Sequence, residues 1–252
     1  MTAADPAFAA DWRKAPEHVP GGAGDLHLWR ARLTPAPTAG ALTQPERDRA
    51  SAYRFDADRD RFLARRAALR VAIASHLGSS PADVEVAQRC PTCGSLGHGP
   101  LHVGGGLSVS LSAAGDIALV AVSTGAVGVD VERASSDLDL EGAERTALAA
   151  TELAALPTGL TERTAAFLRL WTAKEAVLKA GGTGLAADPR AVAIDGDAGI
   201  DAAGTRWHVQ RIEVSAGYLA AVATAEPPKR IAEWEVALSA VSPPRGGAAR
   251  HG

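Results

Sequence analysis

The sequence predicts an α+β fold, and the order of its strand-like and helical segments supports that prediction. Each half of the chain runs strand, helix and then further strands, with one long helix in each half. A run of alternating strand and helix units opened by a glycine-rich dinucleotide fingerprint is absent, which argues against a doubly wound parallel sheet. Of the 252 residues, 46% are hydrophobic, enough to form the core of one large domain or two small ones.

Composition also narrows the class of protein. The net charge of −3 gives no strong signature of nucleic-acid or membrane binding. Residues 1–20 lack the apolar stretch of a signal peptide, and no segment has the apolar length needed to span a bilayer. Only two cysteines are present, too few for a disulfide framework. We therefore expect a cytoplasmic protein that binds neither nucleic acid nor membrane.

The first elements are a strand and a capped helix. Residues 1–24 mix Ala, Pro and Gly without a period, so we expect them to be disordered. Residues 25–33 (DLHLWRARL) alternate apolar and polar side chains, which indicates a strand. Thr43 and Glu46 then form the T-x-x-E pattern of a capping box, so a helical region should begin there.

A long helix is expected at about residues 58–77, where apolar residues recur at helical spacing. Gly78 follows at the position where a left-handed residue often ends a helix. The remaining faces of this segment bear five arginines, and either a solvated surface or a functional cationic patch would explain that density. The apolar positions are Phe62, Leu69, Ile73 and Leu77, and the arginines are Arg59, Arg61, Arg65, Arg66 and Arg70.

The middle of the chain reads as a loop followed by three strands. Residues 89–100 (RCPTCGSLGHGP) are rich in turn formers. Residues 107–111 and 117–123 predict a pair of strands joined by Ala-Ala-Gly-Asp, and the second of them is apolar almost throughout, as a buried central strand should be. Residues 126–132 (AVGVDVE) predict a further strand.

The second half adds two helices and more strands. Helices are expected at 141–156 and 161–179, because each is followed by Gly or Pro residues that end a helix. Strand-like runs follow at 191–194, 207–214, 217–224 and 232–238, the last as a possible edge strand, and the tail 242–252 is expected to be disordered.

Two carboxylates on the strand at 126–132 are the first candidate functional residues. Asp130 and Glu132 are two apart, so they share one face of a strand, while Val129 and Val131 point into the core. Adjacent carboxylates repel each other unless a positive charge lies between them. A divalent cation such as Mg²⁺, which accepts one or two carboxylates together with phosphate oxygens, would supply that charge. Two solvated acids on an exposed strand are the alternative.

The helix at 161–179 adds a second set of charged residues. Trp171, Glu175 and Lys179 are spaced by four and share a stripe, with Lys174 beside them. Glu175 could be a third acidic metal ligand, and Lys174 could neutralise a phosphate or a leaving group. An ordinary surface pair between Glu175 and Lys179 would also explain this pattern.

Taken together, these two segments resemble the signature of the Sfp-type 4′-phosphopantetheinyl transferase superfamily. GVDVE is followed about forty residues later by W-x-x-K-E-x-x-x-K, in the order found in that family. The resemblance extends over about residues 25–240, and one motif alone would be weak. Further matching segments are the basic stretch 54–70, Thr151-Glu152-Leu153, Gly182-Thr183-Gly184-Leu185 and Gly217-Tyr218.

The resemblance implies an architecture. The family folds as two similar, pseudo-symmetric α+β halves with the active site in the cleft between them. Applied to this chain, the N-terminal half would span residues 25–125, and the C-terminal half, with the metal motifs, residues 126–241. Because one polypeptide would then form the whole cleft, we expect a monomer.

The resemblance also implies a reaction. The family transfers the 4′-phosphopantetheine group of coenzyme A to a serine of an apo acyl or peptidyl carrier protein and releases 3′,5′-ADP, the activity of a holo-[acyl-carrier-protein] synthase. By analogy, Mg²⁺ would be held by Asp130, Glu132 and Glu175. Glu152 or Glu175 would accept the serine proton, and Lys174 would offset phosphate charge. Arg61, Ser112, Lys174, Lys179 and His98 would contact coenzyme A.

The chain departs from the family pattern at one end of the expected coenzyme A site. The family has a Ser-His pair before the metal strand, and its histidine contacts the 3′-phosphate; here Ser112 is followed by Ala113. A basic residue is also missing between Gly99 and Pro100. We therefore expect an active enzyme with weaker or altered coenzyme A binding, in which Arg89, His98 or the arginine-rich helix could replace the lost contacts. A homologue that binds coenzyme A or the carrier without transferring the group is the alternative.

The loop at 89–100 admits a separate interpretation. Cys90, Cys93, His98 and His102 have a spacing that could close a tetrahedral zinc site, and a turn with two thiols is the plainer interpretation. A small zinc-knuckle nucleic-acid binder is the corresponding third hypothesis. The slightly acidic net charge and an aromatic content of 4% disfavour it, because single-strand binders need aromatic stacking platforms.

Overall fold

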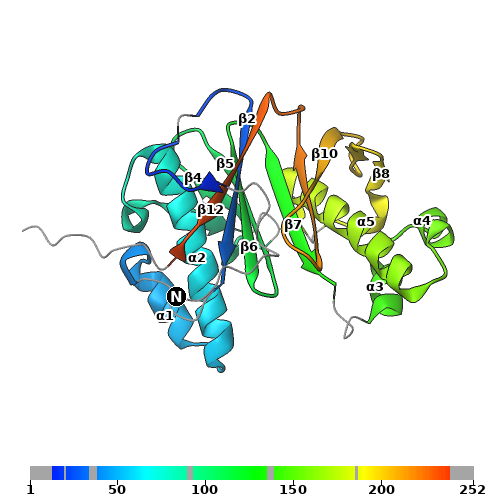
Figure 1. The fold of residues 1–252 in the computed structure, drawn as a ribbon, viewed down its shortest axis with the longest axis horizontal. Helices are drawn as coiled ribbons and strands as arrows, with labels where there is room; N and C mark the ends of the chain where they lie inside the picture. The colour runs from blue at the N-terminus through cyan, green and yellow to red at the C-terminus, as the bar shows by residue number, and fades with distance from the viewer. Residues whose placement is uncertain are drawn as a thin grey trace, which may run out of the picture.

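A computed structural model describes residues 13–19, 21–33, 39–89, 93–134, 139–184 and 187–238. Two five-stranded sheets lie face to face between two long helices, which gives four layers (Figure 1). Helix α2 (Asp56–Leu77) covers the outer face of the first sheet, and helix α5 (Leu160–Ala180) covers the outer face of the second. The predicted α+β class is confirmed, whereas the pseudo-symmetry of its two halves stays a prediction.

The first sheet has the strand order β1-β12-β2-β6-β5. Both β1 and β2 lie parallel to β12, and the other neighbours are antiparallel. Every residue of β6 is buried, as the apolar run at 117–123 predicts. The strands of the first sheet are β1 (Arg13–Lys14), β2 (Asp25–Arg32), β5 (Ser108–Ala114), β6 (Ile117–Ser123) and β12 (Arg230–Val236).

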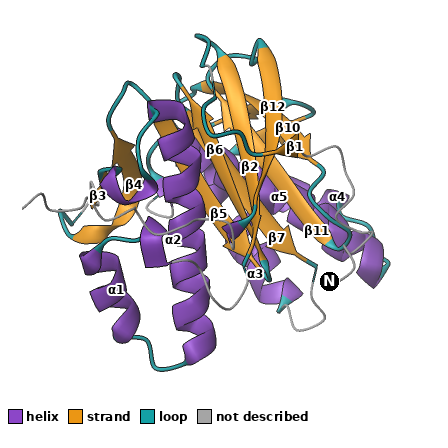
Figure 2. Cartoon of the chain, turned by 60° about the vertical axis from the view of Figure 1, so that its left-hand side comes forward, coloured by secondary structure: helices purple, strands orange, loops and turns teal. Residues whose placement is uncertain are grey.

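The second sheet is antiparallel, with the order β7-β11-β10-β9-β8. It places the GVDVE segment on its edge strand β7, next to the first sheet. Figure 2 shows both sheets from the side of α2. The strands are β7 (Val127–Arg133), β8 (Ala193–Asp195), β9 (Ala198–Ile200), β10 (Arg206–Ile212) and β11 (Tyr218–Thr224).

Smaller elements complete the described part of the chain. Strands β3 (Val86–Arg89) and β4 (Leu96–Val103) form a separate hairpin. Three short α-helices are α1 (Gln44–Ser51), α3 (Leu140–Ala147) and α4 (Ala150–Ala155), and three 3₁₀ turns lie at Ala39–Ala41, Pro81–Asp83 and Pro189–Ala191. Among the described residues, no helix is long and apolar enough to cross a membrane.

Each pair of neighbouring layers shares an apolar cluster. Alternation along the strands sends Trp29 and Val120 toward α2, while Leu28 and Leu119 face the second sheet. On the second sheet Val129 faces the first sheet. Apolar residues on the opposite face of that sheet, together with α5, form the third cluster, which includes Val177, Val209 and Ala221.

Four details differ from the sequence-based expectations. The segment 141–156 is two helices rather than one, because Leu148 is extended and buried and Ala149 begins a new capped helix. Part of the expected loop at 89–100 pairs as β4. The last strand lies inside the sheet, between β1 and β2, rather than at its edge. Within the segment expected to be disordered, β1 pairs with β12 and Arg13 stacks on Trp234; residues 1–12 and the tail 242–252 lie outside the described residues.

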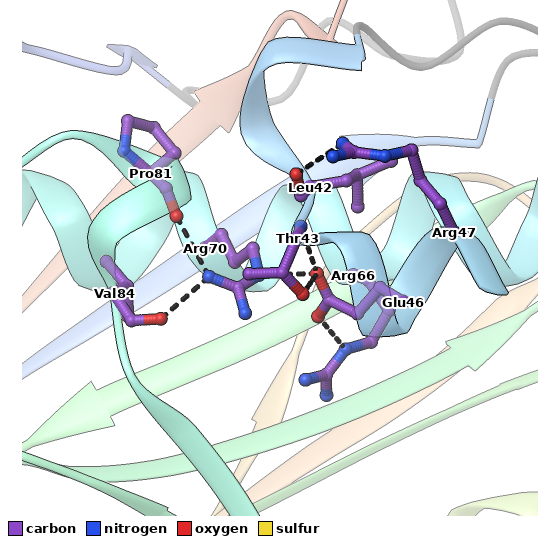
Figure 3. A network of polar contacts seen from close by, with 8 residues as sticks. All are labelled: Leu42, Thr43, Glu46, Arg47, Arg66, Arg70, Pro81 and Val84. Atoms are coloured by element: carbon purple, nitrogen blue, oxygen red, sulfur yellow. Dashed lines mark hydrogen bonds and ion pairs between the residues drawn. The ribbon is translucent and has the colours of Figure 1, made fainter. Parts of the chain in front are cut away.

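The arginines of α2 have two different environments. The capping box of α1 is present, since both the backbone amide and the hydroxyl of Thr43 lie 3.0 Å from Glu46 Oε2. Arg66 and Arg70 each donate to the Glu46 carboxylate at 2.7 Å, and Arg70 also donates to the Val84 carbonyl (Figure 3). These two arginines therefore join α1 to α2. By contrast, Arg61 is exposed on the same helix.

A histidine of β2, His27, and a histidine of α2, His76, pack against tryptophans of the first sheet. The rings of His27 and His76 lie 4.6 Å apart, and His76 also contacts Trp29. Burial is the main cause that lowers the pKa of His76 to about 4, with smaller effects from the charges of His27 and His18. Burial likewise lowers the pKa of His27, while Asp25 opposes that shift. Both side chains are therefore neutral in the native state at pH 7.

This pair predicts a loss of stability in acid. The unfolded chain takes up protons near pH 6.5 and the native His76 only near pH 4, so stability should fall as pH drops between these values. We expect His76→Gln to abolish roughly 2–3 kcal/mol of that loss. Urea unfolding at pH 7 and pH 4.5 measures this loss of stability. The control is His102→Gln, because His102 is exposed. An equal loss in wild type and His76→Gln would contradict this account.

Candidate functional site

The site begins with the close packing of β7 against α5. A side chain at Gly128 would collide with the backbone of α5, at the Ala176 carbonyl and the Ala180 amide. Glycine at this position therefore allows the strand and the helix to touch. Two residues further on, Asp130 faces the same helix, so the glycine of GVDVE sets the distance between the strand carboxylates and α5.

Two serines of β5 connect the sheets at this point. Ser110 Oγ accepts a hydrogen bond from the backbone amide of Val129 at 3.0 Å. Ser112 Oγ lies 2.7 Å from Asp130 Oδ1 and donates to it. Ser112, expected to contact coenzyme A, thus orients a predicted metal ligand in the structure.

Asp130 is buried and binds a lysine of α5. Its Oδ1 accepts from Lys179 Nζ at 2.6 Å, and the same ammonium lies 3.2 Å from the Val129 carbonyl oxygen. The other oxygen, Oδ2, is buried without a hydrogen-bond partner among the described residues. The carboxylate oxygen Oδ1 is therefore paired with a cation, whereas Oδ2 is a buried acceptor that a donor or a cation would stabilise.

Glu132 and Glu175 complete an acidic cluster with Asp130. Glu132 Oε1 accepts from the indole Nε1 of Trp171 at 3.3 Å. Burial raises the pKa of Glu132, and the charge of Asp130 adds to this. Burial likewise raises the pKa of Glu175 to about 7, opposed by Lys179 and assisted by Asp130 and Glu132. The three carboxylates are therefore close enough to repel one another.

The cluster has features that suit a cation. Glu175 Oε1 and Asp130 Oδ2 are buried acceptors without a partner among the described residues, and carboxylate oxygens are the ligands that Mg²⁺ prefers. No three His, Cys, Asp or Glu side chains in the described ranges already adopt the arrangement of a metal site. Metal binding by Asp130, Glu132 and Glu175 thus stays a prediction, supported by the two unsatisfied oxygens.

Lys174 is paired with groups of the protein in the structure, and its expected role against a phosphate stays a prediction. Its side chain is fully buried, and Nζ lies 2.7 Å from Glu152 Oε2 and 3.1 Å from the Pro189 carbonyl oxygen. The same Glu152 oxygen accepts from the Ala149 amide at the start of α4. Lys174 therefore links α4 and the turn at Pro189–Ala191 to α5.

The remaining predicted contacts lie elsewhere. Arg61 is on α2, and within the described ranges no hydrogen bond or ion pair links it to the acidic cluster. His98 is on β4, and its side chain lies outside the described residues. Ala113 is exposed on β5, directly after Ser112. Of the possible zinc ligands, Cys90 lies outside the described residues, so the zinc site stays untested.

Sequence reasoning did not identify the roles of Ser110 and Gly128. Ser110 lies two residues before Ser112, so the alternation of β5 could have pointed to it. Gly128 had a clearer signal, because glycine inside an otherwise β-branched strand often marks close backbone approach.

Comparison with known proteins agrees with the motifs. Residues 126–223 match the sequence model of the 4′-phosphopantetheinyl transferase superfamily. The 4′-phosphopantetheinyl transferase HetI of Nostoc sp. (strain PCC 7120 / SAG 25.82 / UTEX 2576) is 32% identical over 184 residues, which cover 69% of this chain and 76% of HetI. The matched span of 126–223 contains β7, the acidic cluster and all of α5. The chain therefore belongs to the 4′-phosphopantetheinyl transferase superfamily.

Proposed function

We propose that this protein transfers the 4′-phosphopantetheine group of coenzyme A to a serine of an apo acyl or peptidyl carrier protein in a Mg²⁺-dependent reaction. One observation supports it above all. Buried Asp130 and Glu175 form an acidic cluster with half-buried Glu132, and two oxygens of the cluster lack a hydrogen-bond partner among the described residues. When bound there, Mg²⁺ would supply positive charge against the pyrophosphate of coenzyme A.

The proposed step is a phosphoryl-type transfer. The serine oxygen forms a bond to the β-phosphorus, and the bond from that phosphorus to the bridging oxygen breaks, releasing 3′,5′-ADP. Glu175 is the better candidate for accepting the serine proton, and because it also holds Mg²⁺ in this proposal, the proton would reach it through a water. Its Oε1 is unpartnered among the described residues, whereas Glu152 Oε2 already accepts from Lys174 and from Ala149.

The two lysines of α5 have different proposed tasks. Lys179 is partly exposed beside Asp130, so its ammonium can pair with a phosphate oxygen of coenzyme A. Lys174 acts as a positioning residue, because its contacts are with Glu152 and Pro189. Arg61 and His98 are proposed to contact the nucleotide end of coenzyme A.

The sequence also supports proposals about the carrier, the location and the oligomeric state. We propose holo-[acyl-carrier-protein] synthase activity on carriers of fatty-acid, polyketide or non-ribosomal peptide synthesis. The high content of Ala, Gly and Arg is typical of a GC-rich genome, and on that basis we propose a role in secondary metabolism. The two-cysteine composition favours the cytoplasm, and the formation of both halves by one chain favours a monomer.

Ala113 motivates the second candidate, a homologue that binds coenzyme A or the carrier without transfer. The exposed methyl group offers no donor to a 3′-phosphate. Incubation with coenzyme A, Mg²⁺ and a panel of apo carriers, followed by analysis for released 3′,5′-ADP, separates the two. Nucleotide release that depends on a carrier supports the transferase. Binding of coenzyme A without release supports the second candidate.

Ala113 also gives a gain-of-function prediction. Its side chain is exposed next to Ser112, so a histidine there has room to reach solvent and a bound phosphate. A charge-assisted hydrogen bond contributes about 1.5–3 kcal/mol, so Ala113→His should tighten coenzyme A binding roughly ten- to a hundredfold. Calorimetric titration with coenzyme A and with 3′-dephospho-coenzyme A measures this. An equal gain for both ligands, or no gain for either, would refute the proposed phosphate contact.

A further inference from the structure

A hollow of about 460 Å³ lies between α5 and the hairpin of β10 and β11. Its lining includes Arg169 and Thr172 from α5, Arg211 from β10, and Leu219 from β11. In Figure 1, α5 and β10 lie side by side on the same side of the molecule. The sequence-based assignments give no function to either arginine.

The two arginines place positive charge at this hollow. Arg211 Nη1 donates to the backbone carbonyl of Arg169 at 2.9 Å, which holds the two residues together. Partial burial, and then the charge of Arg169, lower the pKa of Arg211. Neither guanidinium forms an ion pair with a carboxylate in the described part of the chain. Glu213 also lines the hollow, so an anionic group that enters it would meet two arginines against one carboxylate, an excess of positive charge.

The hollow is adjacent to the acidic cluster. Leu219, which lines it, pairs across the sheet with Glu132. Thr172, also in the lining, follows Trp171, whose indole donates to Glu132. Any chain segment held in the hollow thus lies next to the place where the proposed transfer occurs.

We propose that this hollow docks an acidic segment of the carrier protein through Arg169 and Arg211. The proposal rests on the proposed transferase function, which requires a protein substrate to bring its serine to the cluster. Two arginines in the lining suit Asp and Glu side chains of such a partner, and electrostatic complementarity of this kind affects encounter and affinity more than chemistry.

The test compares the double variant Arg169→Glu/Arg211→Glu with wild type on an apo carrier that wild type modifies. We expect KM for the carrier to rise about tenfold or more, while kcat and KM for coenzyme A stay within about twofold. Arg206→Glu is the matched control, because Arg206 is exposed at the other end of β10 and does not line the hollow. The milder pair Arg169→Gln/Arg211→Gln should raise KM less and preserves the test if charge reversal disturbs folding.

A complementary swap makes the test specific. Replacing single Asp or Glu residues of the carrier by Lys should restore modification by the reversed enzyme at one position or more. An unchanged KM for the carrier would overturn the docking proposal alone, as would an increase in KM for coenzyme A instead. If wild type modifies no carrier in the panel, the transferase function fails first and the docking proposal falls with it.

Discussion

Glu175→Gln will lower kcat/KM for phosphopantetheine transfer by roughly 100- to 1000-fold, because the reaction loses a charge placed where phosphate chemistry occurs. Glu175 is buried, and its Oε1 has no hydrogen-bond partner in the described residues. The amide keeps the shape of the side chain but binds a cation weakly and does not accept a proton. Steady-state kinetics at saturating coenzyme A measure the effect.

The control uses the same substitution on the same helix. Glu162 is exposed in the first turn of α5, so Glu162→Gln should retain transfer within about twofold of wild type, as surface changes usually do. Removing one of three mutually repelling carboxylates should leave thermal stability unchanged or higher. Full activity of Glu175→Gln would show that the acidic cluster is not the reaction site.

Gly128→Ala is expected to destabilise the protein strongly. The added carbon would overlap backbone atoms of α5 at Ala176 and Ala180, which no side-chain rotation can relieve. We expect at least about 3 kcal/mol of lost stability. If the protein still folds, α5 must move away from β7, and a displacement of about 1 Å would lower transfer roughly 100-fold.

A nearby glycine provides the comparison. Gly125 precedes the same strand, and a side chain there meets no atom within 4 Å. Gly125→Ala should therefore change the free energy of unfolding by no more than about 0.5 kcal/mol. Urea denaturation of the two variants decides the matter. Equal stability of Gly128→Ala and Gly125→Ala would contradict the close packing of β7 on α5.

Local patterns in the sequence predicted most of the fold. The capping box at Thr43, the αL glycine at Gly78 and the apolar run of β6 act over a few residues, so their outcome can be derived from the sequence. The break between α3 and α4 could not be derived in this way. There Leu148 is extended and buried at a tertiary contact with Phe167 and Leu168, which outweighs its helix propensity.

In the candidate site, too, local patterns predicted some features and tertiary contacts determine the others. Strand alternation predicted that Asp130 and Glu132 share a face, and helical spacing predicted that Glu175 and Lys179 share a stripe. The hydrogen-bond partner of each charged group depends on packing between segments that are distant in the sequence. The bond from Lys174 to Glu152 and the one from Ser112 to Asp130 both link separate elements, so no local pattern reveals them.

The most direct test of phosphopantetheine transfer is the intact mass of an apo carrier protein after incubation with this enzyme, coenzyme A and Mg²⁺. The account predicts a gain equal to one phosphopantetheine group on the carrier, located to a serine by fragmentation. The gain should disappear when Mg²⁺ is chelated and fall sharply with Glu175→Gln. An unchanged mass across fatty-acid, polyketide and non-ribosomal peptide carriers would contradict the account.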